Sequence, residues 1–190
     1  LVLEQSRRLA ARLVGWQPER LLTSAFRRTL ETTAAVAEAT GLRPEVVVDL
    51  HEQGGCQAGA SPEVYEGRPG LTRDEIVDQF GDWVLPESID EEGWWKCRRW
   101  ERPDEAEERA RRVAAELVGR FGDLQTKVAV LTHGMFKPIL VSALLGRPFI
   151  GNEWLGDLYN TSVTQLSLSA AGVTLGSYND TSHLVGDGEL

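Results

Sequence analysis

Side chains able to bind and transfer a phosphoryl group occur at three separate places in the sequence. Arg27 and Arg28 follow a short apolar run, Glu52 follows a β-branched run, and His133 with Gly134 follows a longer apolar run. An arginine and an imidazole can bind phosphoryl oxygens, and a carboxylic acid can protonate a departing alkoxide. If these residues lie together in the folded chain, they suit the chemistry of phosphate monoesters.

Each of these residues also has a simpler interpretation. Arg27 and Arg28 could be solvated helix residues that form ion pairs with Glu31. His133 could simply cap a helix, and its place at a strand-to-helix corner before a glycine leaves a role in anion binding equally open. Glu52 taken alone is typical of a solvated loop carboxylate. The hypothesis therefore depends on all three positions meeting at one site.

Alternating strand and helix patterns predict how these residues are positioned. The fold class that we expect is α/β, a three-layer α/β/α sandwich with a mostly parallel central sheet. Ligands of such sheets bind beyond the carboxyl ends of the strands, where all three motifs fall. Apolar periodicity predicts helices over 1–14, 26–40, from Pro103 to Phe121, and over 135–145, strands over 20–24, 46–48 and 127–132, and a hairpin formed by 162–169 and 173–178.

The segment 61–103 interrupts this alternation, and we call it the lid. It contains four prolines and most of the tryptophans, so we expect a lid-like insertion outside the sheet of a single domain, 1–190. Thr72 and Glu75 have the spacing of a capping box and predict one helix. Trp94, Trp95 and Trp100 favour a packed cover over a ligand platform, and both remain open.

Composition narrows the class of protein. The chain has 190 residues and a formal net charge of −9, which argues against a nucleic-acid surface. No apolar run reaches the ~18 residues of a membrane span. Cys56 and Cys97 lack the spacing of a zinc site or a disulfide framework, and with no leader segment evident this predicts a cytoplasmic protein. The oligomeric state stays open.

Four motifs resemble the histidine phosphatase superfamily, whose fold is phosphoglycerate-mutase-like. They are Ser24-Ala-Phe-Arg-Arg-Thr-Leu-Glu-Thr-Thr33, Asp49-Leu-His-Glu52, Leu131-Thr-His-Gly134 and Asn160-Thr-Ser-Val-Thr-Gln-Leu166, and their order and spacing match that family. The opening 3–10 is similar to the family's first helix, and 178–184 to its common tail. The resemblance covers nearly the whole chain.

The resemblance implies a role for each matching residue. Arg28 would bind the transferring phosphoryl group, whereas Arg27, one position early, would not. Glu52 would be the proton donor. His133 would be the second histidine of the phosphate pocket, and Gly134 would let the main chain approach the phosphate. The resemblance implies no metal or other cofactor and a small phosphorylated substrate, and it gives the segment containing His183 a mostly structural role.

The sequence departs from the family at the nucleophile. The family uses a histidine in an R-H-G motif at the tip of a first, central strand, and this sequence contains no R-H-G. We therefore expect the nucleophile to lie upstream of Leu1. His51 is a poor substitute, because in-line attack on phosphorus requires a nucleophile opposite the acid and His51 adjoins Glu52. A metal site of His51, Glu52 and Cys56 matches no common ligand spacing.

The predicted function is thus a phosphomonoester hydrolase with a phosphohistidine intermediate. Alternatives are a mutase of the phosphoglycerate type, and a non-catalytic module that binds an anion or a protein partner and has lost the nucleophile. A third is a cysteine hydrolase that uses Cys56 or Cys97 with His133.

Overall fold

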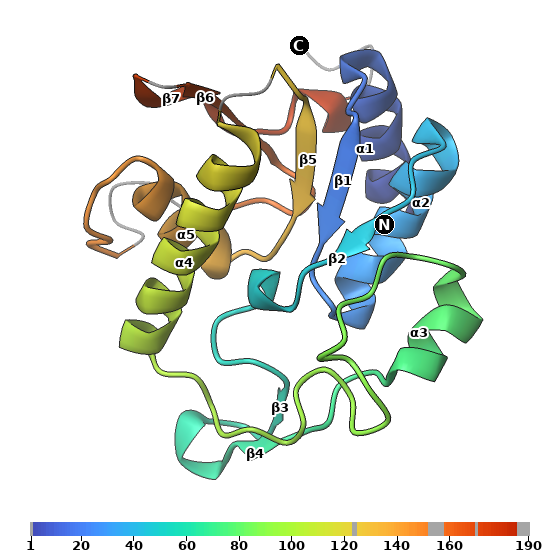
Figure 1. Cartoon of the computed structure of the whole chain (residues 1–190), viewed down its shortest axis with the longest axis vertical. Helices are drawn as coiled ribbons and strands as arrows, with labels where there is room; N and C mark the ends of the chain where they lie inside the picture. The colour runs from blue at the N-terminus through green and yellow to red at the C-terminus, as the bar shows by residue number, and fades with distance from the viewer. Residues whose placement is uncertain (1, 123–124, 152–157, 170, 186–190) are drawn as a thin grey trace.

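A three-stranded parallel sheet forms the centre of the protein. The computed structural model describes residues 2–122, 125–151, 158–169 and 171–185 (Figure 1). Strand β1 (Arg20–Thr23) lies between β2 (Glu45–Val46) and β5 (Val128–Leu131), and both pairings are parallel. The predicted parallel sheet is confirmed for these strands.

Helices cover both faces of this sheet. α1 (Val2–Trp16) and α2 (Arg27–Thr40) lie on one side, and α4 (Pro103–Phe121) and α5 (Phe136–Leu144) lie on the other (Figure 1). Successive strand residues point to opposite faces. Leu21 therefore packs with Leu9 and Val36 against α1 and α2, whereas Leu22 packs with Val113 and the residues of α4 and α5. The sequence patterns predicted all four helices.

Two strand predictions were partly wrong. The predicted strand 46–48 ends at Val46, because Val48 begins a 3-10 turn, η1 (Val48–Leu50), in which the His51 N–H bonds to the Val48 carbonyl. The strand predicted as buried, 127–132, alternates between half-buried and buried residues over β5. Within the described residues only β1 pairs with β5, so β5 has an open edge.

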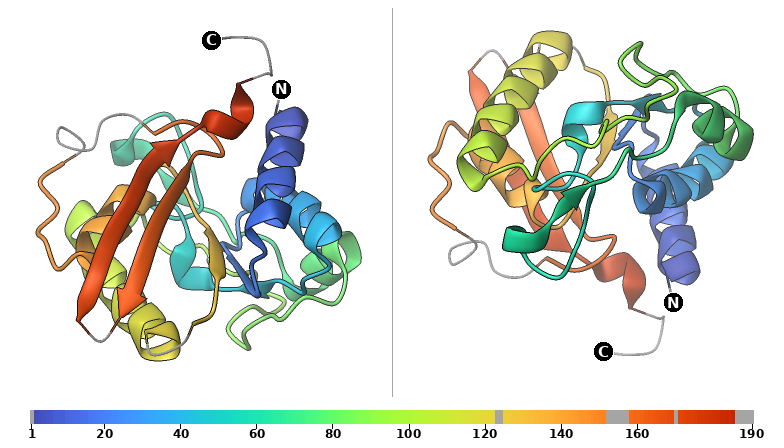
Figure 2. Two further views of the ribbon diagram at one scale, coloured as in Figure 1. Left: turned by 90° about the horizontal axis from the view of Figure 1, so that it is seen from above. Right: turned by 90° about the horizontal axis from the view of Figure 1, so that it is seen from below.

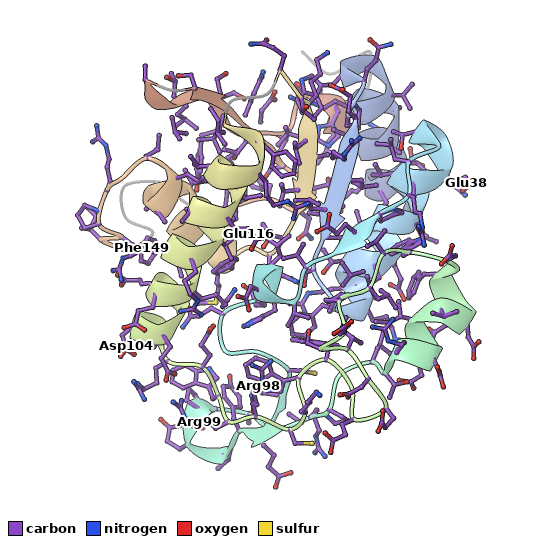
Figure 3. The ribbon with its side chains drawn as sticks, viewed as in Figure 1. Glu38, Arg98, Arg99, Asp104, Glu116 and Phe149 are labelled. Atoms are coloured by element: carbon purple, nitrogen blue, oxygen red, sulfur yellow. The ribbon has the colours of Figure 1, made fainter. Side chains whose placement is uncertain are left out.

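The lid lies mostly outside the sheet. It contains η2 (Pro62–Val64), β4 (Glu66–Gly67), which pairs with β3 (Gln57–Ala58), and α3 (Arg73–Phe80) with the predicted capping box. One correction is needed, because Val84 forms a parallel bridge to Glu45 at the sheet edge. Charged side chains such as Arg98, Arg99 and Asp104 lie on the surface of the lid and of the α4 N-terminus (Figure 3).

The predicted C-terminal hairpin is also present. β6 (Val163–Ser169) pairs antiparallel with β7 (Gly172–Asp180), and η4 (Ser182–Leu184) follows. The hairpin forms its own two-stranded sheet and lies on the side of the open edge of β5 (Figure 2). None of its described side chains is fully buried. Over the part of the chain that the structure describes, no helix combines the length and apolar character needed to cross a bilayer.

Candidate active site

The three predicted motifs meet at the carboxyl edge of the sheet. β1 leads into the first turn of α2, which carries Arg28, and β5 leads through His133 into α5. Arg28 Nη2 and Nε lie 3.0 and 3.2 Å from His133 Nδ1. Arg28 Nη2 also lies 3.8 Å from Glu52 Oε2. Residues that are more than 80 positions apart in the sequence thus form one site, as the strand-tip argument predicts.

The imidazole of His133 is held from both sides. Its Nδ1 accepts hydrogen bonds from Arg28, so the ring proton is on Nε2. Nε2 donates to Ser24 Oγ over 2.8 Å and lies 3.1 Å from Thr29 Oγ1. Burial, and then the charge of Arg28, lower the pKa of His133 to about 3. His133 is therefore neutral at physiological pH and presents an acceptor to Arg28.

Glu52 is bound by main-chain N–H groups. Its Oε1 accepts hydrogen bonds from the N–H groups of Gln53, Met135 and Phe136, each over 3.1 Å. Two of these donors are at the start of α5, where N–H groups lack partners within the helix. Burial nevertheless raises the pKa of Glu52, because desolvation outweighs the hydrogen bonds and the charge of Arg28. A carboxyl group whose pKa is raised is suited to donating a proton.

The two adjacent arginines point in different directions. The Arg28 guanidinium lies 4.4 Å from the centre of the Phe26 ring, and its side chain is 59% exposed, so it can reach a ligand at the site. Arg27 hydrogen-bonds to Gln79 of α3 and takes no part in these contacts. A Cβ added at Gly134 would meet no atom within 4 Å, so packing in this structure does not require a glycine there.

His51 has a structural environment. The side chain is 2% exposed and its ring packs against Trp94 and Trp95. Its Nδ1 donates to the Glu52 carbonyl over 2.8 Å, and burial, with the charge of Arg109, lowers its pKa to about 3. His51 is thus locked beside Glu52 rather than opposite it. Trp94 and Trp95 are both 3% exposed and form a packed cover over this loop.

In the described part of the chain, none of the remaining candidates forms a hydrogen bond with Arg28, Glu52 or His133. Cys56 and Cys97 are free thiols, and burial raises the pKa of Cys56, which disfavours a nucleophilic thiolate. Both ring nitrogens of His133 are engaged by Arg28, Ser24 and Thr29. Among the described residues, no group of three or more His, Cys, Asp or Glu side chains could hold a metal ion. His183 Nδ1, at the C-terminal tail, accepts a hydrogen bond from Arg12 Nη1 of α1 over 3.2 Å.

Several members of the site were not predicted from the sequence. Ser24 and Thr29, which orient His133, lie in the first motif, but neither was assigned a role. The main-chain donors of Met135 and Phe136 were also missed. The signal available for them was the predicted start of a helix directly after His133, since a helix N-terminus offers free N–H groups.

Comparison with known proteins agrees with this geometry. The sequence model of the histidine phosphatase superfamily (branch 1) matches residues 3–181. The comparison with curated proteins gave no match. Among solved structures, the chain is similar to a mycobacterial glucosyl-3-phosphoglycerate phosphatase in complex with VO3, with 25% identity and a TM-score of 0.63 over 94% of this chain and 84% of that one.

Two further solved structures have the same fold. Bacillus stearothermophilus YhfR is 22% identical, and a phosphoserine phosphatase mutant from Entamoeba histolytica in complex with phosphoserine is 16% identical. Each has a TM-score of 0.63 and the alignment covers 96% of this chain and 84% of the other. With the family model matched along nearly its whole length, the chain belongs to the histidine phosphatase superfamily.

Proposed function

We propose that this chain forms the larger part of a phosphomonoester hydrolase that works through a phosphohistidine intermediate. The observation that supports this most directly is the meeting of Arg28, His133 and Glu52 at one edge of the sheet, where Arg28 lies 3.0 Å from His133 and 3.8 Å from Glu52. Together they supply a cation and an imidazole that can bind phosphoryl oxygens and an acid of raised pKa that can protonate the leaving group, but they do not supply the nucleophile.

Each group has a defined part in the proposed reaction. The substrate phosphoryl group binds between Arg28 and His133, with the Gly134 main chain alongside. A histidine from a segment preceding Leu1 attacks phosphorus, and protonated Glu52 gives its proton to the departing oxygen. Glu52, now ionised, then takes a proton from the water that attacks the phosphohistidine, which releases phosphate and restores both groups. The reaction as proposed needs no metal.

The sheet offers a place for the segment that would carry the nucleophile. β5 has an open edge among the described residues, and the hairpin beyond it is a separate sheet. In Figure 1, α1 runs in the direction opposite to β1, as expected of a helix that follows a strand parallel to β1. A strand that preceded α1 and paired with β5 would therefore end beside Arg28 and His133.

A phosphatase is preferred to a mutase as the activity. The similar mycobacterial protein is a phosphatase, and the sequence of the lid contains no recognisable closing tail of the kind that a mutase needs to retain its intermediate. We assign to the lid the selection of the substrate, a small phosphorylated molecule. The lid and the rest of the chain together form a single domain in this proposal. Transfer of phosphate to an added alcohol in preference to water would instead identify a mutase.

The second candidate is a module that binds anions without catalysis. It is favoured by the state of the three histidines: His51 is locked between tryptophans, His133 is bound by Arg28, and His183 contacts α1. Turnover of p-nitrophenyl phosphate discriminates the two candidates. We expect none from this chain alone, and turnover once a strand ending in R-H-G precedes Leu1; continued inactivity would favour the module.

Binding of orthovanadate to this chain tests the site itself. We expect Arg28→Ala to weaken binding, measured by calorimetry, by about 10- to 100-fold, which corresponds to the loss of charge-assisted hydrogen bonds. Arg27→Ala is the matched control. It removes the same charge from the neighbouring position, but the Arg27 side chain faces α3 rather than the site. Equal effects of the two substitutions would contradict the assignment of Arg28 and show only a general effect of charge.

A further inference from the structure

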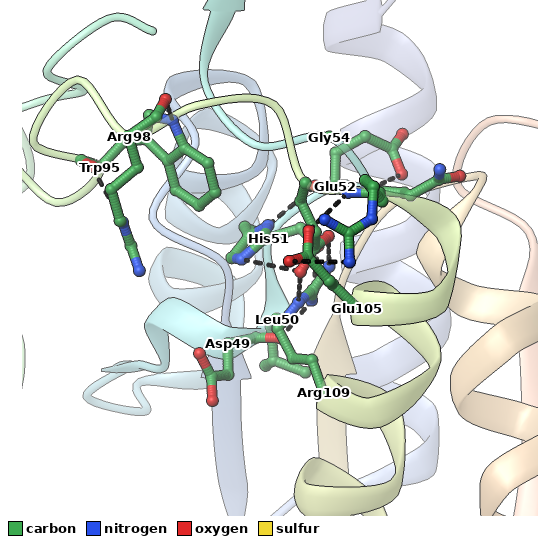
Figure 4. Close-up of polar contacts among 12 residues, drawn as sticks. Asp49, Leu50, His51, Glu52, Gly54, Trp95, Arg98, Glu105 and Arg109 are labelled. Carbon is green, nitrogen blue, oxygen red and sulfur yellow. Dashed lines mark hydrogen bonds and ion pairs between the residues drawn. The ribbon is translucent and has the colours of Figure 1, made fainter.

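Arg109 of α4 has the largest fully buried side chain among the described residues, and its guanidinium lies against the loop that carries Glu52 (Figure 4). Its Nε and Nη2 donate to the two carboxylate oxygens of Glu101, each over 2.7 Å. Its Nη1 donates to the main-chain carbonyls of Asp49 and His51, over 2.6 and 3.0 Å. One guanidinium thus fixes the main chain directly before Glu52.

The same guanidinium also contacts the second segment that holds Glu52. Its central carbon lies 3.7 Å from the centre of the Phe136 ring. The N–H of Phe136 is one of the three that bind Glu52 Oε1. Arg109 therefore touches both the loop that carries the carboxyl group and the start of α5, which supplies two of the three donors to it.

Stability alone does not account for an ion pair at this place. The Arg109 side chain is 2% exposed and that of Glu101 10%, so both charges have lost most of their hydration. Replacing a buried ion pair with apolar side chains of similar size is often neutral or stabilising. What apolar side chains cannot supply is a rigid fork of donors for the Asp49 and His51 carbonyls. The ion pair therefore matters here for the position of the Arg109 donors rather than for its contribution to the free energy of folding.

We propose that Arg109, oriented by Glu101, is the positioning residue for the Glu52 carboxyl group. It holds the loop and the start of α5 in register, so that Oε1 is bound by the main-chain N–H groups and Oε2 faces Arg28. This inference deepens the proposed function and rests on it, because Glu52 is the proton donor there. Arg109 itself does not touch the substrate.

The test measures the titration of Glu52 in this chain, without any turnover. The Glu52 carboxyl resonance is followed by carbon-13 NMR from pH 3 to pH 8 and assigned by its loss in Glu52→Gln. Two variants keep the net charge: Arg109→Lys, and the double variant Arg109→Met with Glu101→Met. Main-chain hydrogen bonds hold the pKa of Glu52 down against burial. Loosening them is expected to raise that pKa by at least about 0.5 in both variants.

Arg120→Met is the matched control. Arg120 lies on the same helix and forms an ion pair with Glu45 over 2.7 Å, away from the Glu52 loop. We expect it to lower thermal stability without moving the pKa of Glu52. If the Arg109 variants lower stability and leave the pKa of Glu52 unchanged, the pair is only structural and the inference is overturned. If the double variant does not fold, Arg109→Lys decides the question alone.

A second readout separates this inference from the proposed function. In the protein extended by the R-H-G strand, Arg109→Lys should slow hydrolysis of alkyl phosphates more than that of p-nitrophenyl phosphate, as should Glu52→Gln, because poor leaving groups need the proton most. Equal losses on both substrates in Glu52→Gln would refute the proton-donor role. The NMR result would still decide whether Arg109 positions the carboxyl group.

Discussion

At the scale of residues, we expect the site to couple anion binding to protonation of His133. His133 Nδ1 accepts hydrogen bonds from Arg28, but an oxyanion offers only acceptors and would meet a lone pair there. Binding of a dianion between Arg28 and His133 therefore favours the protonated imidazole. Because burial and Arg28 lower the pKa of His133 to about 3 in the free protein, the proton must come from solvent when the anion binds.

Sulfate tests this coupling, because it remains a dianion over the whole range of pH used. Above the free-state pKa of about 3 and below the raised pKa of the complex, binding takes up a proton, so sulfate affinity should fall as pH rises. The limiting slope is about tenfold per pH unit. Calorimetry in buffers of different ionisation enthalpy should show the uptake, and His133→Asn should remove it. Uptake that persists in His133→Asn would assign the proton to Glu52.

A site residue can be predicted from the sequence only where the order of strands and helices alone fixes its position. Arg28, Glu52 and His133 were predictable because parallel strands end at one edge, so residues just after them must be neighbours. The bonds from His133 to Ser24 and Thr29 were not, because they depend on the direction of each side chain at the start of α2. The role of Arg109 could not be predicted either, because the sequence of an amphipathic helix does not distinguish a buried arginine from a solvated one.

At the scale of elements, the loop after η1 depends on glycines for close packing against the lid. Gly55 has a φ of +77°, and a Cβ there would lie 2.1 Å from the Trp95 ring. We expect Gly55→Ala to lower the free energy of unfolding by about 2 kcal/mol or more, through backbone strain and overpacking. Gly119→Ala in α4 is the control, since it meets no atom within 4 Å and should stabilise by up to about 1 kcal/mol. Urea unfolding measures both, and a neutral Gly55→Ala would contradict this packing.

The element predictions failed where pairing, rather than propensity, decides the structure. Val46, Val47 and Val48 favour a strand, yet after Val46 the chain turns into η1, which directs the following loop toward the site. The helix from Pro103 was predictable because its apolar period and N-terminal proline act locally. The apolar run over 127–132 correctly predicted a strand, but it predicted more burial than β5 has. An apolar run does not show which elements cover the open edge of a strand.

At the scale of the whole molecule, a well-packed centre contrasts with a C-terminal hairpin in which no described side chain is fully buried. β1 has a partner on each side and three of its four residues are buried. The β6–β7 hairpin is a two-stranded sheet with no fully buried described side chain, and such hairpins are marginal by themselves. The apolar residues Leu166, Leu168, Val173 and Leu175 alternate along the half-buried face of the hairpin, and a further strand beside β5 would add to their cover.

This division predicts the order of amide hydrogen exchange. Amides of β1 should exchange most slowly among the strands, because they open only with the sheet, and those of β6 and β7 should exchange at least about 100-fold faster, a difference of about 3 kcal/mol in opening free energy. Adding the proposed strand before Leu1 should slow exchange in β5 and β6, with the amides of α3 as the unchanged reference. In the proposed enzyme, a strand paired at the open edge of β5 links the hairpin to the sheet. If amides of β6 exchange as slowly as those of β1 without that strand, the hairpin needs no further partner. That outcome would remove the structural support for an upstream nucleophile.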